Sequence, residues 1–284
     1  MKLISFQNNY FGYGFQIFTH FLQLFRKVPV IINIENNERL NYSLKAMKTF
    51  QLLLFSTIVL LFTATGCIDD LTIRGNGMEA SEGRITPDFN QVKSEGAFDV
   101  HITSGDEPDV TVNAESNILP YIETDVRNHT LRIYIRGVHN VKNQLPMNVY
   151  ITVPDLEGIT QSGSGTVTSG FFTSDRFTVT LSGSGNIETA VDAGTVDALI
   201  SGSGDLVISG AANDAGFTIS GSGKIDAANL TVHDCDAKIS GSGNIWVTVE
   251  HFLSVAISGS GNVYYQGNPE IEKHISGSGN VIRN

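Results

Sequence analysis

The apolar positions in the second half of the chain recur around a tetrapeptide, Ser-Gly-Ser-Gly, which occurs seven times at intervals of 18–20 residues. One column of residues immediately precedes the tetrapeptide, and a second column lies five positions after its first serine. The first column reads Gln161, Leu181, Ile200, Ile219, Ile239, Ile257 and Ile275, and the second reads Val167, Ile187, Leu206, Ile225, Ile245, Val263 and Val281. Thirteen of these fourteen positions are aliphatic, so the repeat carries its own candidate core.

The residues beside the tetrapeptide alternate between apolar and polar, as in FTVTLS at 177–182 and LSVAIS at 253–258. A two-residue period is typical of β-strands, and a sequence period near 19 is typical of a solenoid. A flexible Gly/Ser linker would not keep such a period. The pattern therefore predicts an all-β protein in which residues 159–284 form a parallel β-helix with one coil of 18–20 residues per repeat.

The tetrapeptide itself is predicted to be a corner between two strands of each coil. Stacked coils lie about 4.8 Å apart, and glycine permits both a close backbone approach and a positive φ at such a corner. Serine hydroxyls are expected to bond neighbouring backbone groups. The corner segment has a constant length, so the variation in coil length must fall on the opposite side of the coil. An amide ladder is expected from the asparagines that follow the corner: Asn186, Asn244, Asn262 and Asn280.

Residues 90–158 lack the tetrapeptide but contain strand-like segments separated by turn residues, which predicts an all-β N-terminal module. Either this module caps the first coil or it forms irregular early coils. At the other end only NVIRN follows the last tetrapeptide, and an uncovered strand edge favours pairing with another chain. Either Arg283 and the terminus blunt this edge, or self-association covers it.

The N-terminal part of the chain has the composition of a processing segment. Residues 47–66 combine a lysine, an apolar run and small residues, as in a secretory signal peptide, and Cys67 follows directly. This arrangement resembles the lipobox of bacterial lipoproteins, where the cysteine is lipidated. We therefore expect a lipid anchor on Cys67 in the outer membrane and a flexible tether over residues 67–89. Residues 1–46 precede the signal segment, so Met47 is expected to be the true start.

Charge and cysteine content narrow the classes of function. From residue 67 onward the chain carries 12 Lys and Arg against 27 Asp and Glu, a formal charge of −15. Such an acidic surface argues against binding to nucleic-acid phosphates. If Cys67 carries lipid, Cys235 has no partner for a disulfide or a cysteine-based metal site. Cys235 is expected to be a small buried hydrophobe.

The repeats and the segment before them resemble the GIN-domain family of adhesin head domains. The resemblance rests on GSGNI at 183–187 and 241–245, on FDVHITSGDEPDVTVNAESNILPYIETDV at 98–126 and on LRIYI at 131–135. It covers about residues 90–284. It implies a right-handed β-helix and an adhesin-like role in a secreted or lipid-anchored protein of the bacterial envelope. The family supplies no catalytic residues to carry over.

The repeats give little support to metal or polysaccharide chemistry. Calcium-binding Gly-rich repeats need an aspartate in every turn, whereas Lys224 occupies that position in one coil, so no repeat-bound calcium is expected. Glu188 and Asp226 share a column about 10 Å apart by strand spacing, just beyond the separation in inverting glycosidases. The pair leaves two interpretations: the catalytic acids of an enzyme that acts on polysaccharide, or two solvated surface carboxylates. No metal site or cofactor is expected from the histidines. His20 lies in the segment before Met47, and the other six are interpreted as sharing no column and no metal-ligand spacing: His101, His129, His139, His233, His251 and His274.

Trp246 and Tyr264 continue the same column in the next two coils, with Tyr265 beside them. These three side chains are the candidate contact surface for a glycan or protein ligand; the alternative is an aromatic ladder that only packs on the outer face. The sequence therefore predicts a non-catalytic, adhesin-like or interaction scaffold of the cell envelope. The acidic pair at 69–70 resembles surface-export signals of some lipoproteins, which adds surface exposure to this expectation.

Overall fold

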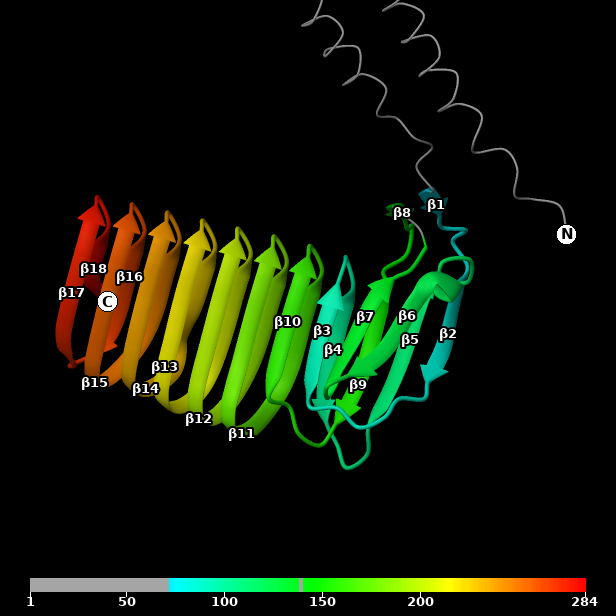
Figure 1. The fold of residues 1–284 in the computed structure, drawn as a ribbon, viewed down its shortest axis with the longest axis horizontal. Coiled ribbons are helices and arrows are strands. Elements are labelled where there is room, and N and C mark those ends of the chain that lie inside the picture. Colours follow the sequence, from blue (N-terminus) through cyan, green and yellow to red (C-terminus); the bar gives the residue numbers. More distant parts are fainter. Residues whose placement is uncertain (1–71, 138–139) are drawn as a thin grey trace, which may run out of the picture. The chain divides into compact units, whose positions relative to one another are not determined.

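The computed structural model describes residues 72–137 and 140–284, and this part of the chain consists almost entirely of β-strands (Figure 1). Among these residues, no helix has the length and hydropathy needed to cross a membrane. The elements are β1 (Thr72–Arg74), β2 (Glu79–Arg84), β3 (Gln91–Glu95), β4 (Asp99–Ser104), β5 (Asp109–Glu115), the 3₁₀ turn η1 (Leu119–Tyr121), β6 (Ile122–Arg127), β7 (Thr130–Ile135), β8 (Asn140–Lys142), β9 (Asn148–Val153), β10 (Gly158–Gly163), β11 (Thr166–Gly183), β12 (Asn186–Gly202), β13 (Asp205–Gly221), β14 (Lys224–Gly241), β15 (Asn244–Gly259), β16 (Asn262–Gly267), β17 (Glu270–Gly277) and β18 (Asn280–Arg283).

From β10 onward the strands form a parallel β-helix in which each coil stacks on the next. The long strands β11 to β15 each run from just after one tetrapeptide to the first glycine of the next. Consecutive coils pair in parallel, and Ser201 has Ser182 as its register partner on one side and Ser220 on the other. Figure 1 shows the coils following one another along a single axis, with their corners along one edge. The predicted solenoid and its period are confirmed.

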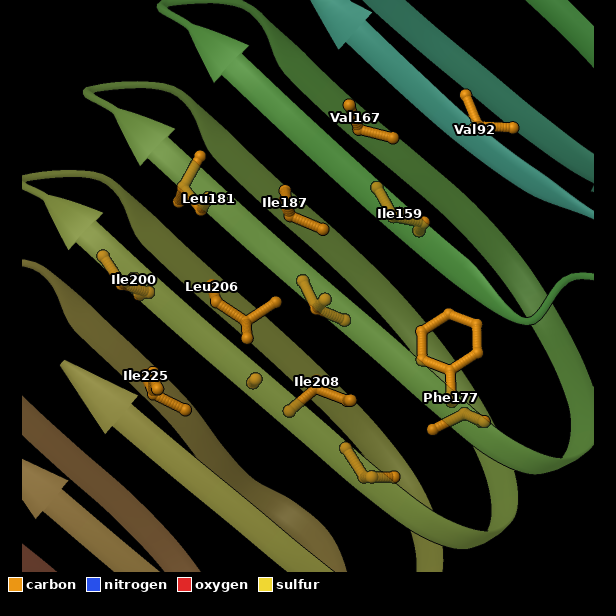
Figure 2. Close-up of a cluster of buried hydrophobic side chains, with 14 of the residues drawn as sticks. Val92, Ile159, Val167, Phe177, Leu181, Ile187, Ile200, Leu206, Ile208 and Ile225 are labelled. Atoms are coloured by element: carbon orange, nitrogen blue, oxygen red, sulfur yellow. The ribbon is translucent and has the colours of Figure 1, made fainter. Parts of the chain in front are cut away.

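Both predicted apolar columns face the interior of the coils. Figure 2 shows Leu181 and Ile200 from one column and Val167 and Ile187 from the other between the two walls of the solenoid. None of these four side chains is more than 1% exposed. Burial of each aliphatic side chain contributes about 1.5–3 kcal/mol, which is largely offset by the entropy lost on ordering the backbone. The stacked columns therefore hold successive coils together.

The corner geometry requires both glycines of the tetrapeptide. Gly202 has a φ of +135°, and a Cβ at this position would overlap the carbonyl oxygen of Gly183 in the preceding coil. A Cβ on Gly204 would likewise overlap the carbonyl oxygen of Gly185. The Ser203 N–H donates a hydrogen bond to the Gly183 carbonyl oxygen at 2.9 Å. The backbone N–H of the serine thus links the corners, and not its hydroxyl as predicted.

The asparagine ladder forms in the last three coils. Asn262 Nδ2 donates to Asn244 Oδ1 at 3.2 Å, and Asn280 Nδ2 donates to Asn262 Oδ1 at 3.3 Å. Asn186 does not extend the ladder, because its register partner in the next coil is Asp205. The register shifts between coils begin three or more residues after a corner, so the corner segment keeps a constant length, as predicted.

The N-terminal module contributes an irregular early coil. β3 pairs in parallel with β10, and β4 pairs in parallel with β11. Gly96 has a φ of +142° and takes the place of the first tetrapeptide glycine, since a Cβ on Gly163 would overlap the Gly96 carbonyl oxygen. Ser94 is the register partner of Gln161, the polar member of the first column. The corner sequence here is EGAF, which is why the tetrapeptide did not mark this coil.

The remaining strands of the module close the N-terminal end of the solenoid. β7 continues the parallel ladder of β3, and β9 continues that of β4. β6 then pairs with β7, β5 with β9 and β2 with β5, all in the antiparallel sense. The sequence left open whether the module caps the first coil or forms irregular early coils. It does both: one part forms an early coil and the rest forms a cap.

Residues 72–84, where a flexible tether was expected, form β1 and β2 instead. β1 pairs with β8 and β2 pairs with β5. The buried Glu115 carboxylate accepts hydrogen bonds from the N–H groups of Gly77, Gln144 and Leu145. Burial by itself raises the pKa of this carboxyl, but the three backbone donors outweigh burial, and the pKa is lowered. The polar, Gly-rich composition indicated flexibility, whereas sheet pairing and this carboxylate order the segment.

The C-terminal coil has a free outer side within the described residues. β17 pairs only with β15, and β18 pairs only with β16. Ile275 is 36% exposed, whereas its register partner Ile257 in the preceding coil is 2% exposed. Ile282 is 38% exposed because it continues the outward-facing column of Trp246 and Tyr264. Arg283 Nη2 donates to the Gly267 carbonyl oxygen at 2.9 Å, which fastens the end of β18 but leaves its outer edge unpaired.

Candidate functional site

Two aromatic side chains of the predicted contact surface stack on the outer wall of the solenoid. Trp246 in β15 and Tyr264 in β16 are register partners. Their ring centroids are 4.8 Å apart, and their planes differ by 9°. Strand alternation buries Ile245 and Val247 and so turns Trp246 outward. The prediction that Trp246 and Tyr264 share a column is confirmed.

A charged pair extends the stack into the preceding coil. Lys224 Nζ lies 4.9 Å from the Trp246 ring centroid and 2.8 Å from Asp226 Oδ2. Asp226 is itself the register partner of Trp246. The indole therefore has an ammonium group on the side of the preceding coil and the Tyr264 ring on the side of the following coil, which combines cation–π and stacking contacts. We call Lys224, Asp226, Trp246 and Tyr264 the aromatic patch; the ring edges and the ion pair are the parts that a partner can contact.

Tyr265 does not join the aromatic patch. It is the register partner of the buried Val247 and packs against the core. Successive side chains of a strand point to opposite faces, so Tyr265 lies on the face opposite to Tyr264. Adjacency of the two tyrosines in the chain therefore did not indicate a shared face, because this alternation separates them.

Glu188 and Asp226 occupy one column as predicted, with Val207 between them. Val207 is 39% exposed, and Asp226 is paired with Lys224. The space between the two carboxylates is thus crossed by an apolar side chain, and one carboxylate is already engaged by an ammonium group. This arrangement gives no support to polysaccharide cleavage.

A groove of about 1110 Å³ lies on the side of the coils opposite the tetrapeptides, next to the N-terminal module. Its arginine, Arg176, is paired with Asp197. A carboxylate-lined surface of this kind repels anions and attracts cations. The lining comes from segments between residues 88 and 213 that only coil stacking brings together, so no signal in the sequence indicates the groove. The groove carries the acidic side chains Asp88, Asp106, Asp155, Glu157, Asp175 and Asp192.

Two histidines and an aspartate lie close together in the middle of β14 and β15. The rings of His233 and His251 stack with centroids 4.7 Å apart and planes 18° apart. Asp234 Oδ2 lies 3.2 Å from His233 Nδ1, and Asp234 Oδ1 lies 2.8 Å from His251 Nδ1. The hydrogen bond with His251, and to a smaller extent that with His233, lowers the pKa of the Asp234 carboxyl.

The expectation that no histidines share a column is corrected for this pair. His233 and His251 each lie seven residues before the first serine of the next tetrapeptide, Ser240 and Ser258 respectively. Counting backward from the corner reveals the shared column. Counting forward from the previous corner hides it, because the two coils differ in length between that corner and the histidines.

Of the two cysteines, only Cys235 lies within the described residues. Cys235 is buried and free, as predicted. Burial, with a further contribution from the Asp236 carboxylate, raises the pKa of its thiol, so it behaves as a small apolar side chain. Cys67, the predicted lipidation residue, lies outside the described residues, as do the signal segment 47–66 and residues 1–46.

A family model matches most of the described chain. Its description is "Putative auto-transporter adhesin, head GIN domain", and it matches residues 88–269. The chain belongs to the GIN-domain family. The resemblance seen in the repeats and in the segment before them is thereby confirmed. No curated protein matches this GIN-domain chain.

Solved structures share the fold of this GIN-domain protein. A crystal structure of "a putative adhesin" from Bacteroides fragilis is 26% identical, with a TM-score of 0.68, covering 75% of this chain and 99% of that chain. A "Putative lipid binding protein" from Parabacteroides distasonis is 24% identical, with a TM-score of 0.64 and the same coverage of both chains. "A putative adhesin" from Parabacteroides merdae is 21% identical, with a TM-score of 0.63, covering 76% of this chain and 99% of that chain. The last two likenesses show the fold alone.

Proposed function

We propose that this GIN-domain protein is a non-catalytic, adhesin-like scaffold of the bacterial cell envelope, and that its solenoid presents the aromatic patch to a ligand. The observation that carries the proposal is the Trp246–Tyr264 stack on the outer wall, held in register by β15 and β16. Family membership supports it, since the family is described by adhesin head domains.

The solenoid suits a contact scaffold because its wall fixes the spacing of side chains. Parallel ladders hold neighbouring outward residues about 4.8 Å apart, so the patch is formed before a ligand arrives. Tyrosine and tryptophan supply contact area with few rotatable bonds, and Lys224 further restrains the indole. Little side-chain freedom is then lost on binding.

The chemistry of the aromatic patch favours a neutral, hydroxyl-rich ligand, and we assign it to a glycan. The ring edges of Trp246 and Tyr264 carry an indole N–H donor and a phenolic hydroxyl. Lys224 and Asp226 add a donor and acceptors whose charges balance each other. A protein ligand is the other outcome that the experiment below distinguishes.

The proposal includes attachment to the outer membrane through a lipid on Cys67, with the solenoid facing the cell exterior. Its support is the signal-like segment 47–66 that ends directly before Cys67. Metabolic labelling with a radioactive fatty acid should mark the wild-type chain and not the Cys67→Ser variant. Equal labelling of the two chains would contradict the anchor.

We also assign the free C-terminal coil to a second copy of the chain. The outer edges of β17 and β18 are unpaired, and the apolar columns reach the surface at Ile275. Unpaired strand edges with apolar side chains favour strand addition. A second copy carries the same edge and the same apolar side chains, so it matches the surface in both respects.

The contact role is tested on a glycan array with the full chain, the Trp246→Ala variant and a Tyr121→Ala control. Tyr121 is 38% exposed and lies in η1, away from the patch. We expect the indole truncation to weaken glycan binding at least tenfold and the control to bind like the wild type. The same three chains are also applied to an array of envelope proteins, where binding would identify a protein ligand.

Three results would contradict parts of this proposal. Glycan binding that ignores Trp246→Ala rules out the aromatic patch as the contact site. Binding that appears only on the protein array, and that is lost in Trp246→Ala, replaces the glycan with a protein ligand. Release of new reducing ends from a bound glycan contradicts a non-catalytic role.

A further inference from the structure

We infer that His233, Asp234 and His251 form a binding site for a divalent transition-metal ion such as Zn²⁺. Each residue offers one ligand atom, and these three atoms lie within 4.8 Å of one another. Two imidazole nitrogens and one carboxylate oxygen are a ligand set that proteins use for zinc. The cluster lies apart from the aromatic patch and does not depend on its role.

The spacing of the ligand atoms suits a single ion. The Asp234 oxygens lie 2.8 Å from His251 Nδ1 and 3.2 Å from His233 Nδ1. In a tetrahedral zinc site the metal–ligand distances are about 2.0–2.1 Å, so neighbouring ligand atoms lie about 3.3 Å apart. Small side-chain movements therefore convert the hydrogen-bonded cluster into a set of metal ligands.

The backbone positions the third ligand through a bulge. At the register shift that follows Val249, β15 contains two residues, Glu250 and His251, opposite the single His233 of β14. A bulge re-aims the side chain of one residue on the bulged strand. In this case it places His251 against the ring of His233. The pairs that flank the bulge, Val232 with Val249 and Asp234 with Phe252, are in register and hold the two imidazoles in place. A second register shift lies between Ala227 and Thr231 of β14.

The cluster is open to solvent, which lets an ion enter. The side chains of His233 and His251 are 56% and 66% exposed, and that of Asp234 is 38% exposed. The acidic surface of the chain raises the local concentration of cations. Asp214 is the register partner of Asp234 in the preceding coil and adds a nearby carboxylate.

Ligand type decides which ions the site accepts. Imidazole nitrogens suit Zn²⁺, Co²⁺, Ni²⁺ and Cu²⁺, whereas Ca²⁺ and Mg²⁺ prefer a full set of oxygen ligands. Three protein ligands leave one tetrahedral position for water or for a donor group of a partner. The bound ion would also connect β14 to β15 at the bulge, where the ladder of backbone hydrogen bonds is interrupted.

The test is calorimetric titration of the full chain with Zn²⁺, using His233→Ala, His251→Ala and a His274→Ala control. His274 is an exposed histidine of β17 outside the cluster. We expect one high-affinity ion per chain, at least tenfold weaker binding in each cluster variant and wild-type binding in the control. Asp234→Asn keeps the side-chain shape and should also weaken binding. Co²⁺ in place of Zn²⁺ should give visible absorption bands that disappear in the cluster variants.

Several results would overturn the site. One is a wild-type chain that takes up no Zn²⁺; another is a double His233→Ala, His251→Ala variant that binds like the wild type. Displacement of Zn²⁺ by an equal concentration of Ca²⁺ would place the ion among carboxylates, as in the acidic groove. Zn²⁺ should raise the Tm of the wild type and leave that of the double variant unchanged, because only a bound ion stabilises the folded state. Circular dichroism of the variants checks that each one is folded.

Discussion

The side-chain amide of Gln161 donates a hydrogen bond to the carbonyl oxygen of Gly96 at 3.3 Å and so joins the first tetrapeptide coil to the early coil before it. Gln161 is fully buried, and its Oε1 atom has no hydrogen-bond partner among the described residues. The Gly96 carbonyl oxygen accepts a second bond, from the Gly165 N–H at 3.3 Å. The polar member of the first column is therefore only partly satisfied.

Replacing Gln161 with leucine is expected to stabilise the chain by about 1 kcal/mol. The substitution removes a buried acceptor without a partner and extends the aliphatic column, while the Gly165 N–H still satisfies the Gly96 carbonyl. Urea unfolding of the two chains measures the difference. A less stable leucine variant would show that the bond from Gln161 to Gly96 contributes more than apolar burial.

Alanine at Gly202 is expected to destabilise the chain by about 2–5 kcal/mol. The positive φ penalises any side chain, and the added Cβ overlaps the Gly183 carbonyl oxygen. Gly83 is the matched control, because a Cβ there meets no atom within 4 Å. Gly83→Ala should change the free energy of unfolding by no more than about 0.5 kcal/mol. Equal midpoints for the two variants would contradict the account of the corner.

The N-terminal cap should lose stability in acid because of Glu115. Its pKa is lowered in the folded chain, so its contribution is present above the unfolded pKa of about 4.3 and is lost as the pH falls through the lower folded value. Glu115→Gln should be less stable than the wild type at pH 7, and the gap should narrow below about pH 4. The exposed Glu79→Gln change is the control. A gap that is constant from pH 7 to pH 3 would show that the carboxylate charge has no such role.

Ile275→Lys tests whether the C-terminal coil pairs with a second copy. Static light scattering of the wild type should show a mass that rises with concentration above that of a monomer. The lysine places a charge at the end of the apolar column, where pairing would have to bury it, so this variant should stay monomeric. A wild type that is monomeric at every concentration would remove the proposed dimer.

The solenoid could be predicted because the same corner sequence recurs once in every coil. Ile200 and Ile219 lie 19 residues apart and are register partners, as their shared position before the tetrapeptide indicates. In the coils that carry the tetrapeptide, the corner glycines cannot be replaced by larger residues, since a Cβ on them meets the backbone of the coil before. Around Gly96 the sequence EGAF replaces the tetrapeptide, and a corner forms there that the repeat does not predict.

The outer surface could be predicted only in part. Trp246 and Tyr264 were placed together correctly, because both follow a corner at a constant distance. Tyr265 was grouped with them, although strand alternation turns it toward the core. The composition of residues 67–89 predicts a tether, whereas pairing partners far away in the chain make strands of residues 72–74 and 79–84.

The repeating corners and their aliphatic neighbours are local features, and steric exclusion at the corner determines which residues stack, so the amino-acid order was sufficient for the coil and its core. The pairing of His233 with His251 and the assembly of the acidic groove depend on the opposite side of the coil. On that side insertions and a bulge at Glu250 shift the register, and only the folded backbone defines which side chains become neighbours.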